Sequence, residues 1–402
     1  MIIDKFFIFS KYFNALIGFV AIFVIAKQLS IINFGDFSFY KLMNQYLLYS
    51  EAGLLQYMFR KQSVDKYIDK SEWEKIITYL LISIFSVLTI FTVIGLNWID
   101  VFTQPVFFIF IFISVFIGII TKFTTDQLRI RKQLRKVVLL DTLSNLLLLS
   151  GVLIFLYLNI TDIIYYIILI SLYLIPNLIY IVYDTQLRQL IMINKLTFKL
   201  DSKIFVGSSM LFIYSYLSIV FGTLDRMFIK FGFGLESFGL YSFPYTVVMG
   251  FYMIIQSIFW MNMPNFIYEI KNNDILATKN KFRQYTKKML AIYLFIFIIS
   301  IIVYWIIINF YMLKFTDTME FFVLIHIYQF FSIFLLFEHN YLIAFEKYKI
   351  LNRMIISFIL INIIISYTLL QLNNVYILLI GSILTYVLYI ITVKIVVKKC
   401  YQ

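Results

Sequence analysis

The stretch TLDRMFIKFGFGLESFGLYSFPY, residues 223–245, lies just past the middle of the chain and repeats a motif from its beginning. Its run FGLYSF at Phe238–Phe243 echoes FGDFSF at Phe34–Phe39, 204 residues earlier in a chain of 402. A repeat at half the chain length predicts a protein built from two matched halves. In membrane transporters such halves commonly form the binding region between them.

The composition places the chain in a membrane. Hydrophobic residues make up 62% of the sequence, charged residues 14%, and the mean hydropathy is +0.91. So few charges could not cover the surface of a soluble protein of this size. We therefore expect an all-α integral membrane protein, because isolated strands would leave backbone polar groups unsatisfied in lipid.

Twelve hydrophobic segments approach the length that spans a bilayer as a helix. Six spans in each half predict two pseudo-symmetric six-helix lobes, residues 1–203 and 204–402. The predicted spans are 6–26, 37–58, 76–96, 105–121, 137–158 and 162–183, followed by 204–224, 240–262, 289–310, 321–343, 354–371 and 375–396.

The distribution of basic residues predicts the orientation. Most Lys and Arg residues fall in the connections that follow even-numbered spans and in the C-terminal tail, whereas the other connections hold only Lys27, Arg226, Lys230 and Lys314. Lys and Arg concentrate on the cytoplasmic side of membrane proteins. We expect both termini in the cytoplasm. The net charge of +13 reports this asymmetry, and nucleic-acid binding is not expected.

The sequence gives little basis for catalysis or cofactor binding. It contains no GxxxxGK[ST] phosphate-binding loop, no HExxH and no CxxC, and its single cysteine is Cys400. The two histidines, His326 and His339, are too few for a metal centre. We expect a protein that is not an enzyme and that has no metal or cofactor.

Polar and charged residues inside the spans are the candidate functional groups, because buried charge in a membrane is costly and usually functional. In the second span, positions 41, 44, 48 and 51 share one helical face. The candidates are Lys11 and Asn14 in the first span, Lys41, Asn44, Gln45 and Glu51 in the second, Asp141 and Asn145 in the fifth, Asp225 and Arg226 at the end of the seventh, and Glu338 and His339 in the tenth. Tyrosines that could stack on sugar rings are Tyr40, Tyr46, Tyr49, Tyr245 and Tyr252.

Each candidate also has a structural interpretation. Small-residue stripes let transmembrane helices pack closely, and Lys11 and Lys41 could extend to the nearer interface. Asp225 and Arg226 could form an interfacial salt bridge. Glu338 beside His339 suits a proton relay, although a purely structural pair has the same sequence signature.

Two stretches resemble the polysaccharide-biosynthesis flippases. In residues 29–61, the matching positions are Gly35, Phe37 and Ser38, then Gly53-Leu54 ahead of the basic Arg60. In residues 224–245, they are Asp225-Arg226, Gly234-Leu235, Gly239, Tyr241 and Ser242. The chain is thereby similar to Wzx-type O-antigen or capsular repeat-unit flippases of the multidrug/oligosaccharidyl-lipid/polysaccharide exporter superfamily.

The resemblance implies a multi-pass protein of the bacterial inner membrane that moves polyprenyl-diphosphate-linked oligosaccharide units across the bilayer by ion-coupled alternating access. Expected partners are this lipid-linked substrate, membrane lipid, and the polymerase and chain-length proteins of the same pathway. The expected substrate-binding residues are Lys11, Asn14, Lys41, Asn44, Gln45, Arg60, Arg226 and Tyr245, and the expected ion-coupling residues are Glu51, Asp225, Glu338 and His339.

Two other functions stay open at this point. An oligosaccharide-repeat polymerase or ligase has a similar composition, but such enzymes usually carry a long outer loop with catalytic Arg or His. The longest outer connection expected here, residues 225–239, is about 15 residues. A drug/cation antiporter of the same superfamily is the second alternative.

Overall fold

A computed structural model describes residues 2–65, 70–97, 106–185, 187–188, 201–272, 275–345 and 347–400. Within these ranges the chain is helical and contains no strand, as expected for an all-α membrane protein. The chain divides into two compact units, Met1–Tyr216 (unit 1) and Leu217–Gln402 (unit 2). The boundary between them falls inside one helix, α10 (Ser202–Phe221).

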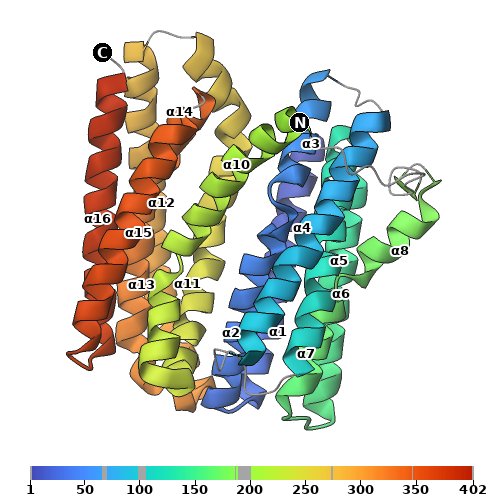
Figure 1. Cartoon of the computed structure of the whole chain (residues 1–402). Helices are drawn as coiled ribbons and strands as arrows, with labels where there is room; N and C mark the ends of the chain where they lie inside the picture. Colours follow the sequence, from blue (N-terminus) through green and yellow to red (C-terminus); the bar gives the residue numbers. More distant parts are fainter. Residues whose placement is uncertain are drawn as a thin grey trace. The chain divides into compact units, whose positions relative to one another are not determined.

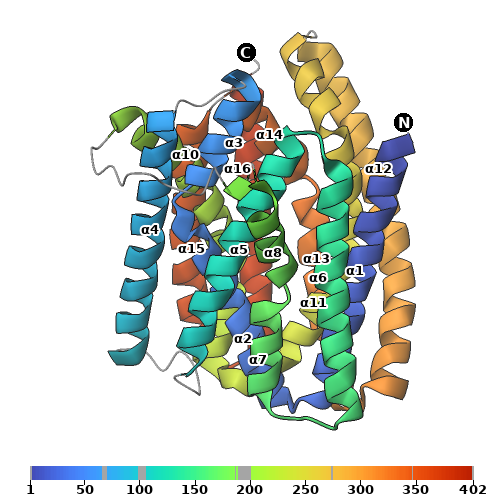
Figure 2. The same ribbon diagram turned by 90° about the vertical axis from the view of Figure 1, so that its right-hand side faces the viewer.

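Unit 1 is a bundle in which α1 and α6 run side by side (Figure 2) and α5 packs against both α2 and α7. Most of its helices carry large apolar side chains on more than one face, which is typical of helices that meet lipid as well as protein. Its helices are α1 (Ile2–Gln28), α2 (Ile31–Leu47), the short 3₁₀ turn η1 (Leu48–Glu51), α3 (Leu54–Asp65), α4 (Lys70–Asn97), α5 (Val106–Ile130), α6 (Leu134–Tyr157), α7 (Ile163–Leu172) and α8 (Ile175–Tyr183).

Unit 2 is a second bundle, in which α15 and α16 pack along their lengths and the long α11 contacts most of the other helices (Figure 1). Its helices are α11 (Leu224–Asn272), α12 (Ile275–Ile306), the π-helical turn η2 (Ile307–Tyr311), η3 (Leu313–Thr318), α13 (Met319–Ser332), α14 (Leu335–Ala344), α15 (Tyr348–Leu370) and α16 (Val375–Cys400).

The connection predicted at 225–239 is wrong, because these residues are helical. α11 begins at Leu224 and is interrupted only at Gly234, whose φ of 84° lies in a region that favours glycine. The echoed motif Phe238–Phe243 therefore follows a helix break by one turn. In unit 1, Phe34–Phe39 likewise lies one turn after Ser30, the N-cap of α2, and Ser30 precedes Gly234 by the same 204 residues that separate the two motifs.

The second predicted span, 37–58, is also interrupted. Ala52 (φ 50°) and Gly53 (φ 73°) adopt left-handed conformations that end η1 and start α3 in a new direction. A Cβ on Gly53 would lie 2.5 Å from the Ser208 carbonyl oxygen of α10. Glycine is thus required both by the backbone conformation and by the close approach of α10.

The described ranges contain nine helical stretches long and apolar enough to cross a membrane. The predicted spans 37–58 and 321–343 are each divided, between α2 and α3 and between α13 and α14, and in α1 the apolar stretch found is Tyr12–Gln28. Twelve spans with both termini in the cytoplasm remains a prediction.

Candidate functional site

The break of α11 at Gly234 in unit 2 brings an acid and a base of the first turn, Asp225 and Arg226, against two tyrosines that follow the break, Tyr241 and Tyr245. The Tyr241 hydroxyl donates a hydrogen bond to Asp225 Oδ2. The Arg226 guanidinium carbon lies 4.1 Å from the centroid of the Tyr245 ring, within the range of a cation–π interaction. Tyr241 and Tyr245 face the same side of α11, because residues four apart share a helical face and their ring centroids are 6.0 Å apart.

A series of tyrosines from other helices of unit 2 extends this cluster. Tyr328 of α13 lies within electrostatic reach of Asp225, Arg226 and Tyr245, and its ring centroid is 4.4 Å from that of Tyr386 on α16. Side chains from α11, α13 and α16 therefore form one polar and aromatic cluster. We call Asp225, Arg226, Tyr241, Tyr245, Tyr328 and Tyr386 the unit 2 cluster.

The series continues along α16 to α14. Tyr386 and Tyr389 have ring centroids 6.3 Å apart, and the Tyr389 hydroxyl lies 2.8 Å from His339 Nε2. The neighbouring Glu338 is within electrostatic reach of Lys394, and its Oε2 is buried with no hydrogen-bond partner among the described residues. The structure thus connects one sequence candidate, His339, to the unit 2 cluster through tyrosines, whereas Glu338 lies near Lys394.

In unit 1, the predicted polar face of the second span packs against α5. Asn44 Nδ2 donates to Ser114 Oγ at 2.8 Å, Leu48 contacts Gly118, and Glu51 pairs with Lys122. The α2 and η1 residues are three or four apart, and so are their α5 partners, so the two faces match turn by turn. Asn44 and Glu51 therefore contribute to helix packing in this structure.

Glu51 is completely buried and uses both carboxylate oxygens. Oε1 pairs with the Lys122 ammonium, and Oε2 accepts a hydrogen bond from the Leu55 N–H at 2.7 Å. Lys122 also lies 5.4 Å from the centroid of the Tyr49 ring. A buried carboxylate needs such partners, because a buried charge left without them destabilises the protein by about 3–5 kcal/mol.

The remaining unit 1 candidates do not form one cluster in the described residues. Lys41 is half-buried with its ammonium 5.9 Å from the Phe37 ring, and Gln45 is exposed. Asn14 is 6% exposed, and neither its Oδ1 nor its Nδ2 has a hydrogen-bond partner in the described part of the chain. The side chains of Lys11 and Arg60 lie outside the described residues.

Two of the tyrosines proposed to stack on sugars belong to the core instead. Tyr40 is completely buried and its hydroxyl lies 2.7 Å from Ser171 Oγ. Tyr252 is 3% exposed and accepts a hydrogen bond from Ser332 at 2.6 Å. Tyr245 remains half-buried beside Arg226, and is the candidate that keeps a cationic neighbour.

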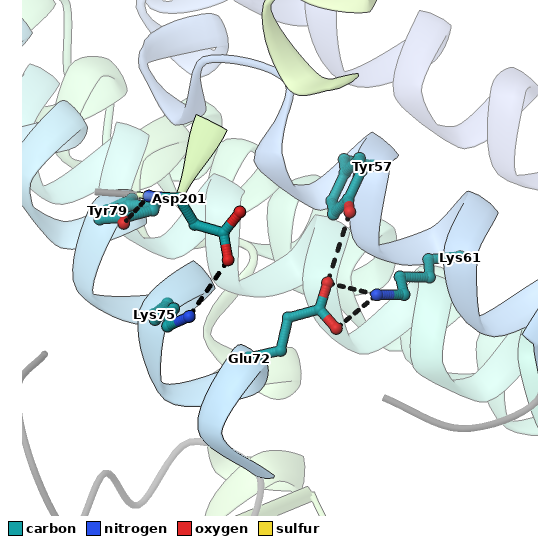
Figure 3. Close-up of polar contacts among 6 residues, drawn as sticks. All are labelled: Tyr57, Lys61, Glu72, Lys75, Tyr79 and Asp201. Carbon is teal, nitrogen blue, oxygen red and sulfur yellow. Dashed lines mark hydrogen bonds and ion pairs between the residues drawn. The ribbon is translucent and has the colours of Figure 1, made fainter. Parts of the chain in front are cut away.

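Ion pairs hold the ends of α3, α4 and α10 together in unit 1 (Figure 3). Glu72 of α4 receives the Lys61 ammonium and the Tyr57 hydroxyl from α3. Lys75 pairs with Asp201 at 3.1 Å, and the Asp201 N–H donates to the Tyr79 hydroxyl at 2.9 Å. These contacts fix the start of α10 to α4.

A second set of polar contacts follows α8. Asp184 accepts hydrogen bonds from the Leu187 N–H at 3.0 Å and the Tyr180 hydroxyl at 2.9 Å, and lies 3.7 Å from the Arg131 guanidinium. Burial alone would raise the pKa of the Asp184 carboxyl, but these two hydrogen bonds together with Arg131 and Lys136 lower that pKa below its usual range.

No group of three or more His, Cys, Asp or Glu residues that could hold a metal ion occurs in the described ranges. The groups that the sequence did not single out are Lys122, Tyr328, Tyr386 and Tyr389. Their spacing carries no motif, and 31 tyrosines are spread along the chain, so only their contacts in the folded protein distinguish them.

No protein-family model matches the sequence, and no curated protein matches it. Solved structures do match over nearly the whole chain. An inward-facing multidrug resistance MATE family transporter of the MOP superfamily gives a TM-score of 0.73 at 12% identity, covering 96% of this chain and 94% of the other. An outward-facing transporter of the same description gives 0.65 at 12% identity, covering 99% and 96%.

A third structure is a MOP superfamily transporter from Pyrococcus furiosus, described as having a binding pocket of reverse polarity that suggests a different function. It gives a TM-score of 0.66 at 12% identity and covers 99% of this chain and 96% of the other. These structural similarities establish the fold of the chain, but at 12% sequence identity they do not establish its substrate. The chain is a multi-pass, all-helical protein with the fold of MATE transporters of the MOP superfamily.

Proposed function

We propose that this protein is a flippase that moves polyprenyl-diphosphate-linked oligosaccharide repeat units across the bacterial inner membrane for O-antigen or capsule assembly. The observation that carries the proposal is the stacking of Arg226 on Tyr245 inside the unit 2 cluster. The transporter fold and the two sequence stretches that resemble polysaccharide flippases support the same conclusion.

The chemistry of the unit 2 cluster suits both parts of such a headgroup. A guanidinium presents several N–H donors in a planar fork that matches the oxygens of a diphosphate. Tyrosine rings offer apolar faces to the C–H surfaces of sugars, and their hydroxyls can bond sugar hydroxyls. The Arg226 guanidinium lies over the Tyr245 ring, 4.1 Å from its centroid, so the cluster places a cation beside an aromatic face.

Asp225 gives the cluster a group that can respond to ion binding. Its carboxylate accepts a hydrogen bond from Tyr241 and lies next to Arg226 in sequence. A proton or sodium ion bound there would change the electrostatic balance at Arg226, since the two charges are neighbours. We propose that Asp225, together with Glu338 and His339, couples substrate release to an ion gradient in an alternating-access cycle.

A deletion strain tests the proposal in cells. The strain should accumulate lipid-linked repeat units in the cytoplasmic leaflet and lose surface glycan, and the wild-type chain should restore both. A polymerase acts after translocation, so its own deletion should leave repeat units in the outer leaflet. Normal surface glycan in the strain that lacks this chain would contradict the proposal.

A drug/cation antiporter is the second candidate, and the pairing of the Asp225 carboxylate with several tyrosines favours it. Aromatic faces and a carboxylate together bind organic cations, and two of the similar structures are multidrug resistance transporters. In that case the deletion strain would keep its surface glycan and become sensitive to cationic dyes. Arg226 beside Asp225 opposes this function, because it repels a cationic ligand.

A further inference from the structure

We propose that His326 of α13 is a proton-binding site in unit 2, distinct from the Asp225, Glu338 and His339 groups. The site is the hydrogen-bond network that joins the imidazole to Tyr293 and Ser300 of α12. It is buried, and none of its residues belongs to the unit 2 cluster.

The imidazole is bonded at both ring nitrogens. His326 Nδ1 lies 2.8 Å from the Tyr293 hydroxyl, and Nε2 lies 3.0 Å from the Ser300 hydroxyl. Each hydroxyl is also committed to a backbone carbonyl. Tyr293 donates to the His326 carbonyl oxygen at 2.9 Å, and Ser300 donates to the Phe297 carbonyl oxygen at 2.8 Å.

Counting hydrogens shows which form of the ring completes this network. A hydroxyl has one hydrogen, and a neutral imidazole has one N–H. Two hydroxyls and a neutral ring thus supply three hydrogens for the four contacts. The imidazolium supplies the fourth, so that both ring N–H groups donate to hydroxyl oxygens while both hydroxyls donate to carbonyls. Only when the ring is protonated does each of the four contacts have its own hydrogen.

The aromatic surroundings also suit a cation. The ring centroid of His326 lies 4.6 Å from that of Phe322, 4.9 Å from Phe297 and 5.7 Å from Tyr293. Aromatic faces attract a desolvated cation. Burial opposes the charged form, so proton uptake depends on both the hydrogen-bond network and these rings.

Other titratable groups lie on different faces or further along the helices. Tyr252 of α11 packs edge-on against Tyr293, and Tyr304 of α12 stacks on Phe322. Asp225, Arg226 and Tyr386 interact with Tyr328, which lies two residues along α13 and so on another face. In η3, Lys314 and Asp317 precede His326 by more than two helical turns, and on α14 Glu338 and His339 follow it by about three.

This inference rests on the proposed transport function in one respect: the proton bound at His326 would be the coupling ion of an ion-driven transport cycle. Protonation itself can be measured without any substrate. The chain has two histidines, so the His339→Gln variant contains His326 alone. The experiment is nitrogen NMR of the full chain, labelled with ¹⁵N-histidine and reconstituted in liposomes, titrated from about pH 8 to about pH 4.

We expect the resonance of the unprotonated ring nitrogen to disappear on acidification while the protein stays folded. Ser300→Ala removes the acceptor of Nε2–H and should lower the proton affinity about tenfold or more. Ser366→Ala, a buried serine of α15 bonded to Asn362, is the matched control and should leave the affinity unchanged. A ring that stays neutral until the protein unfolds would overturn the proposal, as would an unchanged affinity in folded Ser300→Ala. Either result would leave the flippase proposal intact.

Discussion

Arg226 is the residue on which the proposed recognition of a diphosphate depends. Its guanidinium stacks on Tyr245 next to the Asp225–Tyr241 pair. We predict that Arg226→Ala lowers the rate of substrate translocation at least about tenfold, since a charge-assisted hydrogen bond is worth about 1.5–3 kcal/mol. Arg226→Lys should recover only part of the rate, because an ammonium cannot form the planar fork. Flux of lipid-linked oligosaccharide at matched expression measures both.

The neighbouring Lys230 provides the control for this prediction. It carries the same charge one helical turn along α11, and its ammonium lies 4.6 Å from the ring of the exposed Phe231. Lys230→Ala should keep a rate close to that of the wild type. Equal losses in Lys230→Ala and Arg226→Ala would mean that net charge, and not the stacked guanidinium, matters at this end of the helix.

We expect the Asp184 carboxylate to make the stability of the folded protein depend on pH. Its folded pKa is lowered by hydrogen bonds from Leu187 and Tyr180 and by Arg131, so the carboxylate stabilises the folded state above its unfolded pKa of about 3.9. That contribution is lost as the pH falls through the lower folded pKa. Asp184→Asn should therefore be less stable than the wild type at neutral pH and equally stable in acid. Thermal unfolding in detergent across this range checks the convergence; parallel curves at every pH would contradict it.

At the scale of elements, the contact between α2–η1 and α5 depends on Gly118. A Cβ at this position would lie 2.4 Å from Leu48 Cδ2. We predict that Gly118→Ala forces the end of the Leu48 side chain to move and destabilises the protein by about 1 kcal/mol, the lower end of the cost of overpacking. Gly18 of α1 is the matched control, because its Cβ would find the nearest atom at 3.7 Å. Gly18→Ala should be neutral or slightly stabilising in the same denaturation assay.

A double variant then identifies the cause. In Leu48→Ala/Gly118→Ala the clash is removed, so the two changes should destabilise less than their separate effects combined. Strictly additive effects would show that Gly118→Ala does not destabilise the protein through Leu48. They would contradict the proposed packing of α2 and η1 against α5 at this position.

Hydropathy could predict where the helices lie, but not where they break. The long apolar segments of α4, α5, α15 and α16 match predicted spans because lipid imposes their length. The helical conformation of residues 225–239 was not predictable in this way. Gly232, Gly234 and Gly239 favour a loop locally, and only Gly234 actually departs from helical geometry.

The candidate site could be predicted in part for a related reason. Asp225 and Arg226 are adjacent in sequence, but Tyr245 lies 19 residues beyond Arg226, which is about 28 Å along an unbroken helix. Their contact depends on the break at Gly234, and the spacing of the residues did not predict it. Tyr328 and Tyr386 reach the cluster through the packing of α13 and α16, which no local pattern encodes. Conversely, Asn44 and Glu51 form the polar stripe that was expected, and its partner is α5. Periodicity identifies a face of a helix but not what the face contacts.

At the scale of the whole molecule, the distribution of Lys and Arg predicts the orientation. The only cysteine, Cys400, follows a run of basic residues at the end of α16. We predict that a membrane-impermeant maleimide labels Cys400 in inverted membrane vesicles and not in intact cells. Thr161→Cys in a Cys400→Ser background should show the reverse, because residue 161 lies in a predicted outer connection. Labelling of Cys400 in intact cells would invert the predicted topology.

The most direct test of the account is translocation by the purified chain in liposomes. A polyprenyl-diphosphate-linked oligosaccharide is placed in both leaflets, and the fraction open to an external glycosidase is followed after a proton or sodium gradient is applied. We predict that the accessible fraction rises faster than in protein-free liposomes, and that Arg226→Ala abolishes the difference while Lys230→Ala keeps it. An accessible fraction equal to that of protein-free liposomes, from folded protein that exports a cationic dye under the same gradient, would contradict the flippase function.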